Sequence, residues 1–161
     1  MTKSLDTNNV QIKRNRKYEP LVERLCTRKS TYSNKAIFTY IKDLMVFAAM
    51  VGYTLDVREN LESDAIQIVL STYASDEKDG FIYLIALLEE QDPLCLKDDS
   101  LLASIKHFEQ YCNGGLSVIQ GWLEENPGDS EAVDTLVEKI YTQIVQNNKL
   151  ETNDDLPDPQ F

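Results

Sequence analysis

The chain has 161 residues, 42% of them hydrophobic, and carries a net charge of −11, a composition that suits one globular domain with its own core. Its longest apolar stretch, residues 44–52, is far shorter than the roughly 20 residues of a membrane span. Residues 1–9 have no apolar signal core, so we expect a cytoplasmic protein.

The first half of the chain predicts a flexible N-terminus over residues 1–9, a strand and two helices. Residues 10–14 alternate apolar and polar side chains, as a short strand does, and residues 18–29 place apolar side chains at helical spacing. After a polar turn, residues 36–51 are apolar nearly all round, which is typical of a central buried helix. Gly52 is suited to end that helix, because glycine accepts a left-handed backbone.

The second half predicts a polar loop over 54–64, a β-branched strand over 65–70 and several further helices. These helices are expected at 76–90, 101–112, 116–125 and from about 133, with a break at Asn113-Gly114-Gly115 and with Asp129 or Ser130 capping the last one. The fold class is therefore mainly α: a compact bundle of about five to six helices with one or two short strands, near 10–14 and 65–70. Residues 10–147 form a single globular domain in this interpretation, and residues 148–161 form a disordered acidic tail.

Charge is distributed unevenly along the chain. Residues 1–58 hold 11 Lys/Arg and 5 Asp/Glu, a net charge of +6, whereas residues 59–161 hold 5 Lys/Arg and 22 Asp/Glu, a net charge of −17. Within the predicted domain, 10–58 is thus basic and 59–147 is acidic. Such an asymmetry suits a protein that meets two kinds of partner, although a solvated surface without a role is equally compatible with it.

Residues that could carry out catalysis or bind a metal are few. The three cysteines, Cys26, Cys95 and Cys112, are isolated, and the chain has a single histidine, His107. Structural zinc needs about four such ligands at close spacing, so we expect buried free thiols, no metal and no cofactor. No phosphate-binding, dinucleotide-binding or zinc-protease motif is present, and we expect no enzymatic activity.

The basic N-terminal segment is a candidate DNA contact. The order strand, helix, helix is similar to a ribbon-helix-helix module, in which paired strands of a dimer enter the major groove. Alternation would place Gln11 and Lys13 on one face and Val10, Ile12 and Arg14 on the other. The candidate DNA-binding residues are Gln11, Lys13, Arg14, Arg16, Lys17, Arg24, Arg28 and Lys29. The alternative is a basic arm that is solvated or docked on an acidic protein surface.

Two segments carry a family resemblance: Lys42–Tyr53, with the sequence KDLMVFAAMVGY, and Phe108–Leu116, with the sequence FEQYCNGGL. They resemble the small bacterial Dnd (DNA phosphorothioation) system-associated protein family, and the likeness extends over about residues 17–145. Met45 and Met50 replace commoner apolar residues of that pattern, and Cys112 stands where alanine is usual. The resemblance implies a role in DNA modification or phage defence, and it implies no reaction.

The acidic C-terminal tail is a second candidate contact. It ends in Phe161 after Asp154 and Asp155, similar to the acidic tips of bacterial single-stranded DNA-binding proteins, which dock a terminal Phe and its carboxylate on partner enzymes. Pro159 and Gln160 depart from that pattern, and a tail that only solvates the chain is the alternative.

These observations favour a non-catalytic adaptor of a DNA modification or anti-phage defence system. It would join a protein partner to DNA or to a second protein through its two charged regions, and it could form a homodimer. Two alternatives remain open: an acidic DNA mimic that inhibits a DNA-binding enzyme, and a small enzyme with an unmarked site.

Overall fold

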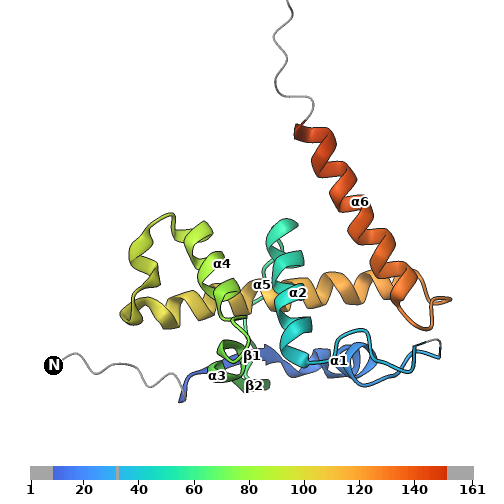
Figure 1. Ribbon diagram of the computed structural model, residues 1–161, viewed down its shortest axis with the longest axis horizontal. Helices are drawn as coiled ribbons and strands as arrows, with labels where there is room; N and C mark the ends of the chain where they lie inside the picture. The colour runs from blue at the N-terminus through green and yellow to red at the C-terminus, as the bar shows by residue number, and fades with distance from the viewer. Residues whose placement is uncertain (1–8, 32, 152–161) are drawn as a thin grey trace, which may run out of the picture. The chain divides into compact units, whose positions relative to one another are not determined.

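The computed structural model describes residues 9–31 and 33–151, and over these residues the expected mainly helical fold is confirmed (Figure 1). They contain six α-helices, three short 3₁₀ helices and a two-stranded sheet. In chain order the elements are β1 (Gln11–Asn15), η2 (Arg16–Tyr18), α1 (Glu19–Cys26), α2 (Ile41–Thr54), β2 (Ala65–Val69), α3 (Leu70–Ala74), α4 (Gly80–Glu90), η3 (Pro93–Leu96), η4 (Asp98–Ser100), α5 (Leu101–Glu125) and α6 (Val133–Glu151).

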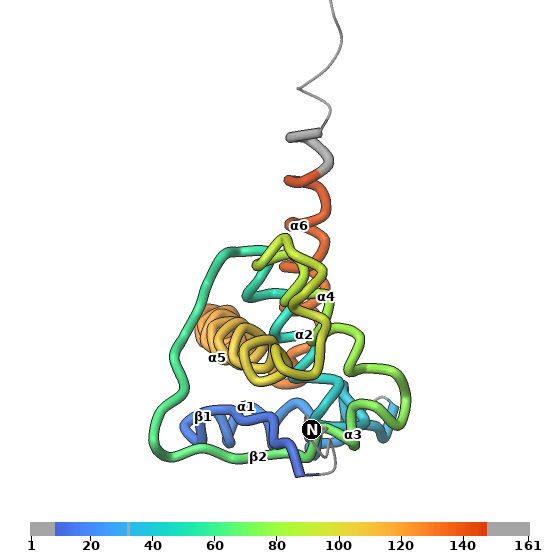
Figure 2. Tube along the Cα trace, turned by 90° about the vertical axis from the view of Figure 1, so that its left-hand side faces the viewer, coloured from blue at the N-terminus to red at the C-terminus, as the bar shows by residue number. Residues whose placement is uncertain are grey.

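Both predicted strands form, and they pair with each other. β1 and β2 are antiparallel, with Ile12 opposite Ile68 and Asn15 opposite Ala65. Figure 2 shows how the chain reaches this register: after α2 it passes around one side of α5 and returns beneath it as β2, next to β1. The sheet and the N-terminal helix α1 thus lie on one side of α5 and α4 lies on the other, while α2 crosses α5 and reaches α1.

The second edge of β1 is occupied by side chains of α5. The backbone N–H of Lys13 donates to Glu109 Oε1 at 2.7 Å, and that of Asn15 donates to Asn113 Oδ1 at 2.8 Å. Glu109 and Asn113 are four residues apart, so they lie on one helical face and match two alternate residues of the strand. α5 therefore takes the place of a third strand.

The predicted helix break at Asn113-Gly114-Gly115 is wrong, because α5 continues through it from Leu101 to Glu125. The glycines serve close packing instead. A Cβ on Gly115 would lie 1.7 Å from the backbone oxygen of Ala48 on α2, and one on Gly114 would lie 2.0 Å from that of Val57. Glycine destabilises a helix by roughly 1 kcal/mol relative to alanine. At these positions the absence of a side chain allows the backbones of two elements to come into contact.

Gly52 has the same function on the facing helix. A Cβ there would lie 2.1 Å from the backbone oxygen of Tyr111. The prediction that Gly52 ends its helix is therefore wrong, since α2 continues to Thr54 with Gly52 buried inside it. No glycine in the described residues has a positive φ.

Three other helix boundaries differ from expectation. α1 ends at Cys26 and α2 begins only at Ile41, so residues 36–40 belong to the connection rather than to the helix. The N–H of Phe38 donates to the carbonyl of Leu25 at 3.0 Å, which holds this connection against the end of α1. α4 begins at Gly80, after the acidic residues expected to open it.

The chain divides into two compact units, Met1–Gln120 and Gly121–Phe161. The core of the first unit combines α2, α3, α4 and α5. Its fully buried members include Met45, Tyr73, Ile85 and Phe108. The Tyr73 and Phe108 rings meet edge to face at 6.0 Å, and the Tyr73 hydroxyl lies 3.0 Å from the Met45 sulfur.

The second unit holds the end of α5 and all of α6. As expected, Asp129 caps the last helix, since its carboxylate accepts the N–H of Thr135 at 2.8 Å. The helix runs to Glu151, past residue 147, where the sequence places the end of the folded domain. Most of its apolar stripe is exposed: Val137 is 62%, Tyr141 67% and Ile144 54% exposed, whereas Leu136 is buried.

No helix in the described part of the chain combines the length and the apolar character that crossing a membrane would require. Residues 1–8 and 152–161 lie outside the described residues, and with them the candidate partner-binding residues Asp154, Asp155 and Phe161.

Candidate functional site

The basic segment expected to contact DNA is largely absorbed by the fold. The predicted alternation along β1 is confirmed: Val10, Ile12 and Arg14 are buried, and Gln11 and Lys13 are half-buried. Arg14 is only 1% exposed, and its Nη2 lies 2.6 Å from Glu19 Oε2. A guanidinium in this position supports the fold and does not face a ligand.

The next two basic side chains are paired with carboxylates of the loop before β2. Arg16 Nε lies 2.6 Å from Asp64 Oδ1. Lys17 Nζ lies 2.8 Å from Glu59 Oε1 and 2.6 Å from Glu62 Oε1. The sheet register explains these pairs, because residues that follow β1 stand opposite residues that precede β2. Basic and acidic segments far apart in the sequence thus neutralise each other here.

The remaining candidates lie on and after α1. Arg24 is half-buried with contacts inside the protein. Arg28 and Lys29 are exposed, and within residues 9–31 and 33–151 neither forms an ion pair. Of the eight candidate DNA-binding residues, only this pair and Lys13 carry cationic side chains that form no ion pair within the described residues, and Lys13 lies close enough to Glu109 to interact with its charge.

A ribbon-helix-helix arrangement is wrong for this strand. In such a module the N-terminal strand pairs with the same strand of a second copy, whereas β1 pairs with β2 of its own chain. Its other edge donates to Glu109 and Asn113. Neither edge of β1 is open to another strand.

The most extensive exposed apolar surface of the first unit lies on α4 and the segment after it. α4 buries Ile82, Ile85 and Ala86 along one stripe. Its other sides are apolar too, and together with η3 and the start of α5 they form what we call the α4 surface. This surface comprises Phe81 (37% exposed), Leu84 (41%), Leu87 (37%), Leu88 (40%), Leu94 (54%), Leu96 (46%) and Leu102 (61%).

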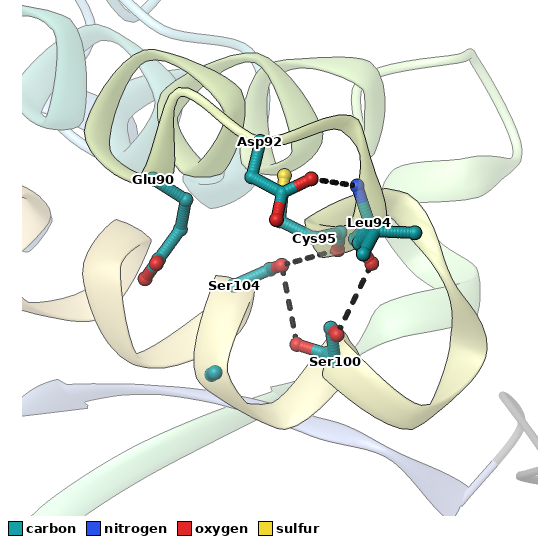
Figure 3. A pocket seen from close by; sticks show the side chains of 7 residues that line it. Glu90, Asp92, Leu94, Cys95, Ser100 and Ser104 are labelled. Atoms are coloured by element: carbon teal, nitrogen blue, oxygen red, sulfur yellow. Dashed lines mark hydrogen bonds between the residues drawn. The ribbon is translucent and has the colours of Figure 1, made fainter.

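A pocket of about 200 Å³ opens within the α4 surface, between the end of α4, η3 and the first turns of α5 (Figure 3). Leu94 and Ala103 contribute apolar atoms to its wall, and Glu90 and Asp92 contribute carboxylates. Cys95 also lines it, as a buried free thiol. The pocket's volume and its two carboxylates suit a lysine or arginine side chain.

The serine hydroxyls of this pocket are used by the fold. Ser104 Oγ lies 3.2 Å from the carbonyl oxygens of both Cys95 and Ser100, and Ser100 Oγ donates to the carbonyl of Leu94 at 3.2 Å. Asp92 accepts the N–H of Leu94 at 2.9 Å, which caps η3. Figure 3 shows these bonds closing the turn between α4 and α5.

His107 lies one turn beyond Ser104 on α5, and its Nε2 is 2.7 Å from Glu90 Oε1. Its Nδ1 has no hydrogen-bond partner among the described residues. An acid–base dyad of this kind needs a nucleophile or substrate group within hydrogen-bond reach of the free nitrogen. Both serines of the neighbouring pocket donate to backbone carbonyls.

Acidic residues flank α4 along the chain. Residues 76–102 carry eight Asp/Glu and two Lys, a net charge of −6. Asp79 precedes α4, Glu90 ends it, and Asp92, Asp98 and Asp99 follow in the exposed turns. In the described part of the chain, no three His, Cys, Asp or Glu side chains gather closely enough to hold a metal ion. Exposed apolar side chains with polar residues beside them are typical of a protein-binding surface. This surface differs from the typical one in that the charged residues beside it are mostly acidic.

Sequence reasoning assigned Phe81–Leu88 to a helix but did not identify this surface. The signal was present: residues 81–88 contain no charged side chain. A helix that is apolar on every side is expected to be covered on every side. The fold covers one stripe of α4, so the rest of the helix is available to another molecule.

Comparison with known proteins gives one family match. The family described as DNA sulphur modification system-associated protein 4 matches residues 11–156, which include every helix and strand described above. No curated protein and no solved structure matches the chain. The match covers far more than half of the chain and agrees with the resemblance carried by Lys42–Tyr53 and Phe108–Leu116. The chain belongs to the family of DNA sulphur modification system-associated protein 4.

Proposed function

We propose that this protein is a non-catalytic accessory subunit of a DNA sulphur modification system, and that it binds another protein of that system through the α4 surface. The observation that carries the proposal is the outer face of α4, where Phe81, Leu84, Leu87 and Leu88 are each more than a third exposed. The family to which the chain belongs supplies the biological setting.

The partner that fits this surface has an apolar patch ringed by lysine and arginine. Burying a large apolar side chain contributes roughly 1.5–3 kcal/mol when it passes from full exposure to full burial. Seven partly exposed residues of this size would supply a substantial part of a stable interface. The surrounding carboxylates would accelerate association with a basic partner and select against acidic ones.

The pocket beside Leu94 supports this interpretation. Interfaces often depend on a few anchor side chains that fill small pockets, and arginine is among the commonest anchors. Glu90 and Asp92 would meet the cationic end of such a side chain, while Leu94 and Ala103 would contact its aliphatic part.

The proposal that the protein is non-catalytic is supported by the hydrogen bonds of the serine, glutamate and histidine side chains near the pocket. Ser100 and Ser104 donate to backbone carbonyls, and the carboxylate of Glu90 is engaged by His107. These bonds fix a turn and engage both serine hydroxyls of the pocket in the fold.

Partner binding can be tested by co-expressing the full chain with each protein of the host's DNA sulphur modification system. Co-purification and calorimetry would then measure binding. We expect one of these proteins to bind, and Leu84→Asp/Leu88→Asp to weaken the complex at least tenfold. The matched control is Val137→Asp on α6, an exposed apolar position outside the α4 surface. Circular dichroism would confirm that each variant folds. Equal binding by the Leu84→Asp/Leu88→Asp variant and the control would exclude the α4 surface.

Catalysis is tested separately by His107→Gln, which removes the only histidine of the chain. We expect unchanged phosphorothioate content in the DNA of cells that carry this variant, measured by mass spectrometry after nuclease digestion. Loss of modification with intact partner binding would overturn the non-catalytic assignment.

A further inference from the structure

The connection between α1 and α2 folds back on the end of α1 and borders an open pocket of about 410 Å³. The N–H of Ser30 donates to the carbonyl of Lys35 at 2.9 Å, and the N–H of Asn34 donates to that of Ser30 at 2.9 Å. Asn34 has φ 53°, a left-handed value that asparagine tolerates better than most residues. In Figure 1 this connection is the blue loop beside α1.

The lining of this pocket is cationic and rich in hydrogen-bond donors. Five polar residues line it: Lys29, Lys35, Thr27, Thr39 and Asn34. Cys26 lines it as well. None of the lining residues is acidic, although the whole chain carries a net charge of −11. Within residues 9–31 and 33–151, the side chains of these five residues have no hydrogen-bond or ion-pair partner.

The cysteine of the pocket adds no negative charge near neutral pH. Burial raises the pKa of the Cys26 thiol to about 11, so the thiol stays protonated. The pocket therefore presents two ammonium groups, two hydroxyls and one amide without an opposing carboxylate in its wall. Oxygen atoms of a phosphate group accept hydrogen bonds from all three kinds of donor.

Residues adjacent to the pocket in the chain could contact more than a single anion. Arg28 precedes Lys29, is exposed and also forms no ion pair within the described residues. On the other side, Tyr40 follows Thr39 in the chain and is 59% exposed, with Lys42 Nζ 5.4 Å from the centre of its ring. A pocket for one phosphate, with a further cation and an exposed aromatic residue adjacent to it in the chain, suits a polymer of phosphates and bases better than a small free anion.

We propose that this pocket, which we call the Lys29–Lys35 pocket, binds a backbone phosphate of DNA. Lys29 and Lys35 neutralise the phosphate, the Thr27 and Thr39 hydroxyls and the Asn34 amide donate to its oxygens, and Arg28 meets a neighbouring phosphate. This site differs from the strand-based contact expected from the sequence, because the fold pairs Arg14, Arg16 and Lys17 with carboxylates. It is also separate from the α4 surface, so the two proposals can fail independently.

The test uses the full chain and a fluorescently labelled DNA duplex, with anisotropy measured at several salt concentrations. We expect binding that weakens with salt, and at least tenfold weaker binding by Lys29→Glu/Lys35→Glu. The slope of log affinity against log salt concentration should fall by about 0.9 for each phosphate that the variant no longer neutralises. The control is Lys106→Glu/Lys97→Glu, which makes the same charge change at two exposed lysines outside the pocket.

Three results would overturn the proposal. The first is equal loss of affinity in the pocket variant and the control, which would indicate a general charge effect. The second is equally tight binding of poly-glutamate of matched charge, since the site would then recognise an acidic peptide as well. The third is binding of inorganic phosphate, seen as NMR shifts of residues 27–39, without any binding of the duplex.

Discussion

At the scale of single residues, folding gives neighbouring basic side chains different roles. Arg14 lies in β1 and Arg16 directly follows the strand, and Arg14 is 1% exposed while the Arg16 side chain is 54% exposed. The difference arises because β1 turns its even-numbered residues toward the core up to Arg14 and then ends at Asn15. Sequence alternation correctly separated the faces of the strand, but it did not show that one face would bury an arginine.

Substitutions of Arg14 should therefore change stability rather than ligand binding. Arg14→Ala would leave a cavity and cost about 3 kcal/mol. Arg14→Met should cost much less, because Nε and Nη1 have no hydrogen-bond partner among the described residues and methionine fills a similar volume. Arg16→Ala, in an exposed pair, should cost under about 1 kcal/mol. Urea denaturation followed by circular dichroism measures all three, and equal losses for the alanine and methionine variants at Arg14 would contradict this account.

Glu109 gives the fold a predictable dependence on pH. Burial raises the pKa of its carboxyl to about 7, against the opposing effect of the hydrogen bond from the Lys13 backbone. The folded state therefore holds this proton more tightly than the unfolded state, whose carboxyl has its ordinary pKa of about 4.5. Stability from this group is fully present below pH 4.5 and is lost as pH rises toward 7, by up to about 3 kcal/mol.

Glu109→Gln should remove that loss. The amide oxygen can still accept the N–H of Lys13, and it carries no charge to bury. We expect the variant to be more stable than the native protein at pH 8 and to show a flatter stability profile between pH 5 and 7. Thermal unfolding across this range measures the effect, and a variant that stays parallel to the native protein would show that Glu109 does not titrate in this window.

At the scale of elements, the largest difference from expectation is the 25-residue helix α5. The pair Gly114-Gly115 indicated a break, because glycine usually interrupts a helix when nothing compensates its cost. Here α2 and the chain after it approach so closely that any side chain would overlap backbone atoms. Only the position of a distant segment decides whether such glycines end a helix or allow two elements to meet.

Substitutions of two glycines in α5 distinguish the effect of close packing from the effect of helix propensity. Gly115→Ala should destabilise the protein by about 3 kcal/mol or more, because its Cβ would overlap the Ala48 carbonyl on a rigid helix. Gly121→Ala, in the same helix with nothing within 4 Å of its Cβ, should stabilise it by about 0.5–1 kcal/mol through helix propensity. Thermal denaturation of both variants checks the prediction, and changes of the same sign would contradict it.

At the scale of the whole molecule, the linear charge asymmetry is partly cancelled by folding. The acidic loop before β2 neutralises Arg16 and Lys17, whereas Arg28, Lys29 and Lys35 form no ion pair within the described residues. Exposed carboxylates without an ion pair among the described residues, Asp92, Asp98 and Asp99, flank the α4 surface along the chain. Two separate candidate binding surfaces remain: the Lys29–Lys35 pocket retains Lys29 from the basic segment that the sequence singled out first, whereas the α4 surface lies outside that segment.

A protein that joins a partner to DNA should lose each interaction separately. We expect Leu84→Asp/Leu88→Asp to weaken partner binding without changing DNA affinity, and Lys29→Glu/Lys35→Glu to have the opposite effect. The native chain should form a ternary complex detectable by analytical ultracentrifugation with labelled DNA. Mutual exclusion of DNA and partner would indicate a DNA mimic or competitor instead of an adaptor.

The sequence by itself determined the helical class, both strands, the cap of the last helix and the family motifs. These depend on local periodicity and on residue types that act on their near neighbours. The tertiary structure decided which basic side chains stay unpaired, why the glycines lie inside helices, and that α4 keeps an apolar side uncovered. Each of these depends on contacts between segments roughly 40 to 100 residues apart, whose register and distance no local pattern contains.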